Sequence, residues 1–482
     1  MRPTLIWFRR DLRLNDHPAL AHALETGNGI LPVYIHTPEE EKEWAPGGAT
    51  RWWLHHSLRA LSDDLARRGA PLVIRRGPSR ETLEDLVRET GAEQVVWNRL
   101  YDPALIQRDR EIKAVLRERG VQVESFNATL LMEPWSVGNR AGRPYRVFTP
   151  FWKACRALGA TEQSPGPSAP DALPGMTDRP PSLDLDALGL LPRVRWDSGL
   201  AAAWQPGEAG ARAALGDFRE TALGGYARDR DRPGRTGTSR LSPHLHFGEI
   251  GPRTLAAACV QAREVAPESV ERFLSELGWR EFAHHLLFHF PETTTRPLDR
   301  RFEDLPAAEP GEIPFEAWCQ GRTGLPIVDA GMRELWHTGW MHNRVRMITA
   351  SLLTKNLRAP WLEGARWFWD TLVDADLAAN TLGWQWTAGC GADAAPYFRI
   401  FNPVLQGERF DAGGDYVRRW VPELAGLPDR YVHRPWEAPA AVLRDARVDL
   451  GRDYPRPVVD LATSRREALA AWAQIRDRKK AD

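Results

Sequence analysis

Residues 5–8 read Leu-Ile-Trp-Phe and are the first of five short apolar runs near the N-terminus. Runs of this length between polar residues are typical of buried strands, and the segments that separate them have a helical period. One such segment carries leucines at the spacing of a single helix face, at positions 54, 58, 61 and 65. We therefore expect a doubly wound, parallel α/β domain. The other apolar runs are residues 30–35, 72–74, 95–97 and 121–123.

The first predicted strand is not followed by the glycines that hold phosphates in many nucleotide-binding domains. Residues 9–13 read Arg-Arg-Asp-Leu-Arg, and the chain has neither a GxGxxG fingerprint nor a Walker lysine loop. Ordinary binding of NAD or a nucleoside triphosphate is therefore disfavoured. A GxSxG elbow is also missing from the sequence, so hydrolase chemistry has little support.

The composition changes after the α/β region. Residues 165–192 contain seven prolines among Ser, Asp and Gly, which suits an irregular connection. Beyond residue 200 the pattern is helical, for instance over residues 270–290 and 328–356. We expect an α/β domain at residues 1–130, a linker at 131–200 and an all-helical domain at 201–482.

Charge and composition exclude several classes of protein. Lys plus Arg and Asp plus Glu both number 64, so a polycation is excluded and an anionic partner needs a local basic patch. The chain has no apolar run long enough for a membrane span and no secretory signal, so we expect a cytoplasmic protein. The four cysteines form no CxxC pair, and no metal site is predicted. His284 and His285 lack the partners of a metal site or triad and are expected to pack in a helix.

Three segments concentrate residues that could carry chemistry. Residues 226–242 hold five arginines, four of them before a Gly-Thr-Ser-Arg-Leu-Ser turn that contains the fifth. This segment suits either phosphate binding or a solvated loop with a capped helix. Glu276, Trp279 and Arg280 share one helix face, either as a functional site or as an internal ion pair beside a packed indole. Residues 374–386 combine acids, an amide and two tryptophans.

Taken together, these segments resemble the DNA photolyase/cryptochrome family, with class I cyclobutane pyrimidine dimer photolyases as the nearest group. The resemblance runs in order along nearly the whole chain. It is carried by WFRRDLRLNDHPAL (7–20), GTSRLSPHLHFG (237–248), LSELGWREF (274–282), GRTGLPIVDAGMREL (321–335), GWMHNRVRM (339–347), DADLAANTLGWQWTAGCGADAAPYFRIFNP (374–403) and YPRPVVDL (454–461).

The resemblance implies FAD, active as FADH⁻, in the helical domain and an antenna chromophore of folate or deazaflavin type in the α/β domain. An ion pair between Asp374 and Arg346 is expected beside the flavin ring, and Asn380 is expected near flavin N5. The cofactor-binding residues implied by the resemblance are Tyr226, Thr238, Ser239, Leu241, Ser242, Arg280, Asn343, Arg346, Asp374, Asp376 and Asn380.

The implied activity is that of a deoxyribodipyrimidine photo-lyase, which splits a flipped cyclobutane dimer in UV-damaged DNA by light-driven electron transfer. A monomer without a membrane or an obligate protein partner is expected. The catalytic residues implied are Glu276, Trp361, Asn380 and Trp384. The residues implied to bind DNA or the lesion are Arg230, Glu276, Trp279, Asn343, Arg344, Met347, Trp386 and Arg399.

A few positions bear on two alternatives, a (6-4) photolyase and a blue-light photoreceptor of cryptochrome type. Asn343 and Met347 stand where (6-4) photolyases resemble one another in having two histidines. Asn380 is the photolyase choice, and only a short segment follows residues 454–461, which disfavours a long signalling tail.

Two positions depart from the family pattern. The third tryptophan of the usual electron relay falls near Ala307 or Ala308, so that Trp318 or Trp336 would have to replace it. Ala104 and Leu105 replace the acid and the amide that grip a folate antenna in some relatives, which leaves the antenna's identity open.

Overall fold

A computed structural model describes residues 2–309, 311, 313–394 and 398–476 of the chain. The chain forms two units, neither of which is continuous in sequence. Unit 1 comprises residues 1–224, 239–291 and 373–377, whereas unit 2 comprises residues 225–238, 292–372 and 378–482. Among the described residues, no helix is long and apolar enough to cross a membrane.

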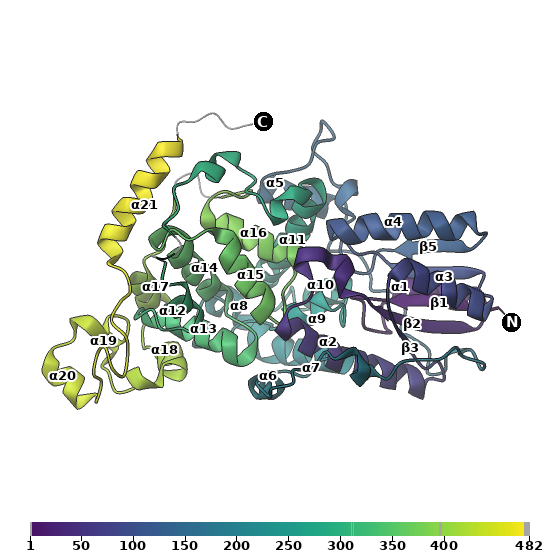
Figure 1. Ribbon diagram of the computed structural model, residues 1–482, viewed down its shortest axis with the longest axis horizontal. Helices are drawn as coiled ribbons and strands as arrows, with labels where there is room; N and C mark the ends of the chain where they lie inside the picture. Colours follow the sequence, from purple (N-terminus) through teal and green to yellow (C-terminus); the bar gives the residue numbers. More distant parts are fainter. Residues whose placement is uncertain (1, 310, 312, 395–397, 477–482) are drawn as a thin grey trace. The chain divides into compact units, whose positions relative to one another are not determined.

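Unit 1 is built on a parallel sheet with the strand order β3-β2-β1-β4-β5 (Figure 1). This sheet and the largely helical remainder of the chain confirm the predicted fold class. In the register of the central strand, Thr4 pairs with Ile30 on one side and with Gln94 on the other. Each predicted apolar run overlaps one strand. The strands are β1 (Thr4–Phe8), β2 (Ile30–His36), β3 (Val73–Arg76), β4 (Gln94–Asn98) and β5 (Gln122–Phe126).

Alternate residues of β1 face opposite sides of the sheet, because side chains alternate along a strand. Ile6 and Phe8 join the core formed with α1 and α2. Leu5 and Trp7 join the core formed with α3 and α4. Both faces are therefore covered, which explains why the strands read as continuous apolar runs. The four helices are α1 (Pro18–Glu25), α2 (Gly48–Arg67), α3 (Ser79–Thr90) and α4 (Pro103–Glu118).

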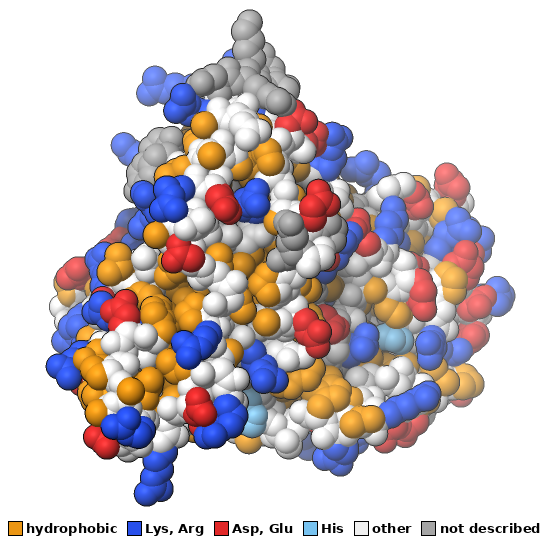
Figure 2. Space-filling view, turned by 60° about the vertical axis from the view of Figure 1, so that its left-hand side comes forward, with side chains coloured by type: hydrophobic (Ala, Val, Ile, Leu, Met, Phe, Trp, Pro, Cys, Tyr) orange, Lys and Arg blue, Asp and Glu red, His pale blue; other side chains and the backbone are white. Residues whose placement is uncertain are grey.

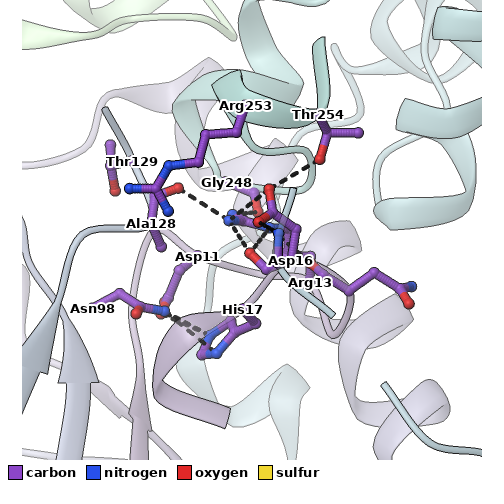
Figure 3. A network of polar contacts seen from close by, with 12 residues as sticks. Asp11, Arg13, Asp16, His17, Asn98, Ala128, Thr129, Gly248, Arg253 and Thr254 are labelled. Atoms are coloured by element: carbon purple, nitrogen blue, oxygen red, sulfur yellow. Dashed lines mark hydrogen bonds and ion pairs between the residues drawn. The ribbon is translucent and has the colours of Figure 1, made fainter. Parts of the chain in front are cut away.

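A buried arginine fixes the segment that follows β1 (Figure 3). The Arg13 guanidinium donates to the carbonyl oxygens of Asp16 (2.5 Å), Gly248 (2.8 Å) and Ala128 (3.0 Å). Thr254 Oγ1 donates to the Asp16 carboxylate (2.9 Å). A single side chain thus satisfies a local backbone acceptor and two acceptors from distant parts of unit 1, and it holds the segment around Gly248 against the loop after β1.

The remaining helices of unit 1 follow the sheet in sequence. The predicted helix over residues 270–290 is observed as α11 (Pro267–His289). The expected linker contains few elements, among them α5 (Phe148–Ala157). The expected domain boundaries at residues 130 and 200 stay a prediction, although residues 239–291 group with the α/β sheet in unit 1. The others are α6 (Ser198–Ala203), α7 (Glu208–Asp217), α9 (Ser242–His246) and α10 (Pro252–Val260).

Unit 2 is helical. The pattern over residues 328–356 is divided at Gly339, which ends a helix in the left-handed conformation (φ 66°) that glycine adopts without strain. The helices are α8 (Tyr226–Asp229), α12 (Phe315–Cys319), α13 (Pro326–Thr338), α14 (Asn343–Ser351), α15 (Trp361–Thr371), α16 (Leu377–Ala388), α17 (Pro403–Phe410), α18 (Asp415–Trp420), α19 (Asp429–Val432), α20 (Ala440–Asp445) and α21 (Leu461–Arg476).

A buried lysine joins two of these elements. Lys355 lies in a π-helical turn after α14 and donates to the carbonyl oxygen of Ala388, the last residue of α16 (2.5 Å). Its ammonium nitrogen lies 3.2 Å from the centroid of the Phe398 ring. Burial lowers the pKa of Lys355 to about 7.

Candidate functional site

The structure brings together residues of unit 1 that are far apart in sequence. Ser242 begins α9, and its Oγ donates to Asp374 Oδ2 (2.6 Å). Nearby in sequence, Ser239 Oγ accepts a bond from the backbone N–H of Leu241 (3.4 Å), whose side chain is buried. Two predicted cofactor residues, Ser242 and Asp374, are therefore in direct contact.

Asp376 lies between two buried imidazoles. Its Oδ2 is 3.5 Å from His284 Nε2 and 3.7 Å from His246 Nδ1. Burial alone would raise the pKa of Asp376, but the charges of the neighbouring His284 and His246 imidazoles hold it well below its ordinary value. Burial lowers the pKa of His246. Asp376 is therefore an anion, and it can accept hydrogen bonds from a polar ligand.

The role of His284 was not apparent from the sequence. We expected it to pack in a helix, and it does lie buried on α11, but it also contacts Asp376. The two residues come together only through the tertiary fold, so no local pattern could have indicated this pair. The neighbouring His285 accepts a bond from the backbone N–H of Tyr145 (3.0 Å), as a packing residue would.

The predicted lesion-binding face of α11 has separate contacts for each residue. Glu276 Oε1 lies 3.7 Å from Arg272 Nε, one helical turn earlier. Arg280 donates to the carbonyl oxygen of Thr129 (2.8 Å) instead of forming the internal pair with Glu276 that was the alternative. Trp279 is half-buried and stacks on Phe148, with ring centroids 3.9 Å apart.

In unit 2, the start of α14 places several predicted residues on one short helix. His342 caps α14 by accepting a bond from the backbone N–H of Arg344, and burial lowers the pKa of His342 to about 4. Asn343 is exposed and Met347 is half-buried. Arg346 Nε donates to the carbonyl oxygen of Met341 (2.8 Å).

The arginines predicted to meet DNA already have protein contacts. Arg344 forms an ion pair with Asp231 at 2.9 Å. The Arg230 guanidinium lies 5.5 Å from the centroid of the Tyr226 ring, and that of the exposed Arg399 lies 4.7 Å from the Phe401 ring. Figure 2 shows one face on which Lys and Arg side chains stand among exposed hydrophobic ones. A chain of zero net charge therefore still presents local positive charge.

On α16, Asn380 is buried and held in one orientation. Its Nδ2 donates to the carbonyl oxygen of Ala365 on α15 (3.0 Å), and no hydrogen bond among the described residues engages its Oδ1. The sequence pattern of α16 could not predict this hydrogen bond, because Ala365 lies on another helix. Trp386, also on α16, donates from Nε1 to the carbonyl oxygen of Asp393 (3.1 Å).

The tryptophans proposed for electron transfer differ sharply in exposure. Trp384 is buried and lies directly against Gly364 of α15, the helix that begins at Trp361. The ring centroids of Trp318 and Trp384 lie 6.2 Å apart, but Trp318 is fully buried. Trp336 is 60% exposed. Of the two candidates for a surface tryptophan, only Trp336 can contact solvent.

The predicted site draws on both units. Thr238, Asn343, Arg346 and Asn380 belong to unit 2, whereas Arg280, Asp374 and Asp376 belong to unit 1. The expected ion pair between Asp374 and Arg346 therefore stays a prediction, as do the roles of the individual site residues.

The donors and acceptors in each unit fit FAD. Neither Nδ1 of His246 nor either ring nitrogen of His284 has a hydrogen-bond partner among the described residues, although these atoms are buried beside Asp376. Buried polar atoms ordinarily have partners, so these nitrogens indicate that a polar ligand completes the site. Asn380 Oδ1 supplies a further acceptor in unit 2.

Comparison with known proteins accounts for both parts of the chain. Residues 4–171 match the model of the DNA photolyase family, and residues 273–474 match that of the FAD-binding domain of DNA photolyase. The chain is 49% identical to a deoxyribodipyrimidine photo-lyase of Agrobacterium fabrum, over 98% of both chains. It is 40% identical to cryptochrome-1 of Arabidopsis thaliana, over 98% of this chain and 70% of that protein.

A solved structure gives the same result. The crystal structure of a bacterial class III photolyase from Agrobacterium tumefaciens superimposes with a TM-score of 0.94 and 48% identity, over 99% of this chain and 98% of that chain. The fold and the comparisons thus indicate an FAD-binding protein of the photolyase type. The chain belongs to the DNA photolyase/cryptochrome family, a family of flavoproteins that includes DNA repair enzymes.

Proposed function

We propose that this protein is a light-dependent lyase that splits cyclobutane pyrimidine dimers in UV-damaged DNA. The observation that carries the proposal is the 49% identity to a deoxyribodipyrimidine photo-lyase over nearly the full length of both chains. Bound FAD, in its reduced anionic form, supplies the electron that opens the dimer. The chain's own residues bind, orient and shield the reacting groups.

Repair of (6-4) photoproducts is disfavoured by the residues at the start of α14. Asn343 and Met347 offer no imidazole that could donate a proton there. The adjacent His342 does not replace one, because burial lowers its pKa to about 4 and its Nδ1 is engaged with the backbone of Arg344. A cyclobutane dimer needs no such proton donor, so Asn343 and Met347 are compatible with its repair.

The lesion is held by side chains from both units in this proposal. Trp279 offers a flat ring that stacks on Phe148, Trp386 offers another ring, and Met347 offers an apolar contact. Glu276 accepts a hydrogen bond from the dimer base. Arg230, Arg344 and Arg399 meet the phosphates around the flipped dimer.

In this proposal, the electron route to the flavin starts at Trp336 on the surface. Trp384 lies against α15 at Gly364, and Trp361 and Trp367 lie one turn before and after that contact. Trp367 stacks on the exposed Trp336, with ring centroids 6.1 Å apart. Trp336 thus takes the place of the surface tryptophan missing at Ala307 and Ala308.

The motifs suggest class I, and we propose class III as an alternative subclass, which is supported by the 48% identical crystal structure of a class III photolyase. We propose a monomeric, cytoplasmic enzyme with an antenna chromophore of folate or deazaflavin type. A blue-light photoreceptor is the second candidate, supported by the 40% identity to cryptochrome-1 of Arabidopsis thaliana.

The test is cleavage of an oligonucleotide that contains a single thymine dimer, with and without blue light, followed by chromatography. Light-dependent release of intact thymines supports repair, whereas unchanged dimer with FAD fully bound supports the photoreceptor. A (6-4) oligonucleotide under the same light should remain unchanged. Glu276→Gln should lower the yield per absorbed photon because it weakens a shielded hydrogen bond, which is worth roughly 1 to 3 kcal/mol. Its matched control is Glu268→Gln, an exposed glutamate near the start of the same helix.

A further inference from the structure

Unit 2 contains a cavity of about 650 Å³ that none of the predicted cofactor or DNA residues lines. A cavity of this volume is in the range of small-molecule sites. Its walls come from α13, α15 and α18, together with the last residue of α12 and Gln320 after it. The apolar walls are the indoles of Trp336, Trp367 and Trp420, and the polar lining comes from Gln320, Arg333 and His337.

Arg333 is held rigidly at this cavity. Its Nε donates to the carbonyl oxygen of Gly321 (3.1 Å), and its Nη1 lies 2.8 Å from Glu423 Oε1. Nη1 also donates to the carbonyl oxygen of Trp420 (3.4 Å). No hydrogen bond of the described residues engages Nη2. A guanidinium fixed by its other nitrogens presents this remaining group to a carboxylate with little loss of side-chain freedom.

The cavity wall includes the exposed end of the proposed electron route. Trp336 is 60% exposed and stacks on Trp367, with the ring planes only 10° apart. A flat aromatic ligand in the cavity would therefore contact Trp336 itself. On the far side of the cavity, the imidazole of His337 packs against Trp420, with ring centroids 5.8 Å apart.

We propose that this cavity binds a small phenolic carboxylate that returns electrons to Trp336, an inference that rests on the proposed function. The phenol ring stacks on the indoles, and the carboxylate accepts hydrogen bonds from Arg333. In each event the phenol gives one electron to the oxidised Trp336 and releases its hydroxyl proton to water. The indole is restored and a phenoxyl radical leaves. Two such events supply the two electrons that, together with one proton taken up from water, reduce FAD to FADH⁻.

The first test measures binding in the dark, without DNA, by calorimetric titration of the FAD-loaded protein with 4-hydroxyphenylacetate. A ligand of this size is expected to bind with a dissociation constant of roughly millimolar order. Arg333→Gln should weaken binding at least tenfold, because a charged hydrogen bond is lost. Arg322→Gln, an exposed neighbour that does not line the cavity, should leave it unchanged.

His337→Glu is a second variant, chosen because His337 is exposed and its replacement should not disturb folding. The added carboxylate should repel the probe and weaken binding at least tenfold. The absence of dark binding to the wild-type protein would overturn the proposal. Equal binding by the wild type and both cavity variants would overturn it as well.

The second test measures the rate of flavin photoreduction against the concentration of 4-hydroxyphenylacetate. The rate should saturate at the dissociation constant found in the dark, and phenylacetate, which has no hydroxyl to oxidise, should compete. Trp336→Phe should lose the photoreduction even at probe concentrations that saturate the binding measured for this variant in the dark. A rate that rises linearly without saturating would show collisional reduction and overturn the proposal. Dimer repair by chemically reduced protein tests the proposed function separately, because it needs neither the cavity nor Trp336.

Discussion

Replacing Asn380 by Asp tests whether its amide is held in one orientation by Ala365. In the wild type, Nδ2 donates to the Ala365 carbonyl oxygen at 3.0 Å, and the side chain is buried. An ionised aspartate would place a carboxylate oxygen against that carbonyl, with no donor between them. The variant must therefore either take up a proton, which restores the donor, or lose the interaction.

The loss of folding free energy in Asn380→Asp follows from the ordinary pKa of aspartate, about 3.9. Keeping the carboxyl protonated at pH 7 requires a rise of about 3 units, and each unit costs about 1.4 kcal/mol. Asn380→Asp should thus destabilise the protein by about 4 kcal/mol at pH 7. Because the pKa is raised in the folded state, the penalty is small near pH 4 and grows as the pH rises toward the folded-state pKa.

The assay is urea unfolding of the FAD-loaded protein at pH 5 and pH 7.5. Asn380→Ala is the matched control, since it removes the same donor without adding a titratable group, and its loss of stability should be equal at both pH values. The reasoning is refuted if Asn380→Asp loses the same free energy of unfolding at both pH values. A photoreduced flavin spectrum identical to that of the wild type would remove Asn380 from the flavin site.

Three further predictions concern stacking, DNA contacts and a buried charge. Trp279→Ala should weaken binding to dimer-containing DNA by about 1 to 3 kcal/mol while intact duplex is little affected, because base stacking on an aromatic ring is worth that much; equal losses in a gel-shift titration of both DNAs would contradict this role. Each phosphate contact contributes about −0.9 to the salt slope of log affinity, but Arg344 is already paired with Asp231, so Arg344→Ala should flatten the slope by less than 0.9. Asp231→Asn should steepen the slope in the same titration, and a flattening of 0.9 or more by Arg344→Ala would show that the ion pair does not persist on DNA. Since burial lowers the pKa of Lys355 to about 7, the unfolded chain binds more protons above that pH, and stability should rise with pH from about 7 toward 10. Lys355→Met should remove this rise in urea unfolding, and superimposable profiles of the two proteins would show that Lys355 remains charged when folded.

The sheet could be predicted because its signal is local. Each strand is buried on both faces, so the sequence shows a continuous apolar run that needs no knowledge of its neighbours. Residues 5–8 and 30–35 coincide with β1 and β2 almost residue for residue. The helix over residues 328–356 was less well predicted, since its apolar pattern continues across Gly339 while the backbone does not.

The contacts that shape the candidate site could not be predicted, because each joins residues from different elements. Ser242 meets Asp374, and His284 meets Asp376, through folding alone. The resemblance to the family predicted that Asp374 and Asp376 belong to the site, but it did not predict which side chains contact them. The pairing of Arg344 with Asp231 was likewise invisible, although it decides how much charge that arginine offers to DNA.

The placement of residues 373–377 in unit 1 has a consequence for the order in which the protein is made. Val373 is fully buried in the core that also contains Phe8 and Trp53, so this core lacks one of its members until residue 373 has left the ribosome. At about 5 to 20 residues per second, translation needs roughly 20 to 75 seconds to reach that point. The N-terminal sheet must therefore wait, with part of its core open, while nearly half of unit 2 is synthesised. A chaperone that shields exposed apolar surface would act on this protein during that interval, and a nascent chain stalled before residue 373 should be more sensitive to protease than one stalled after residue 377.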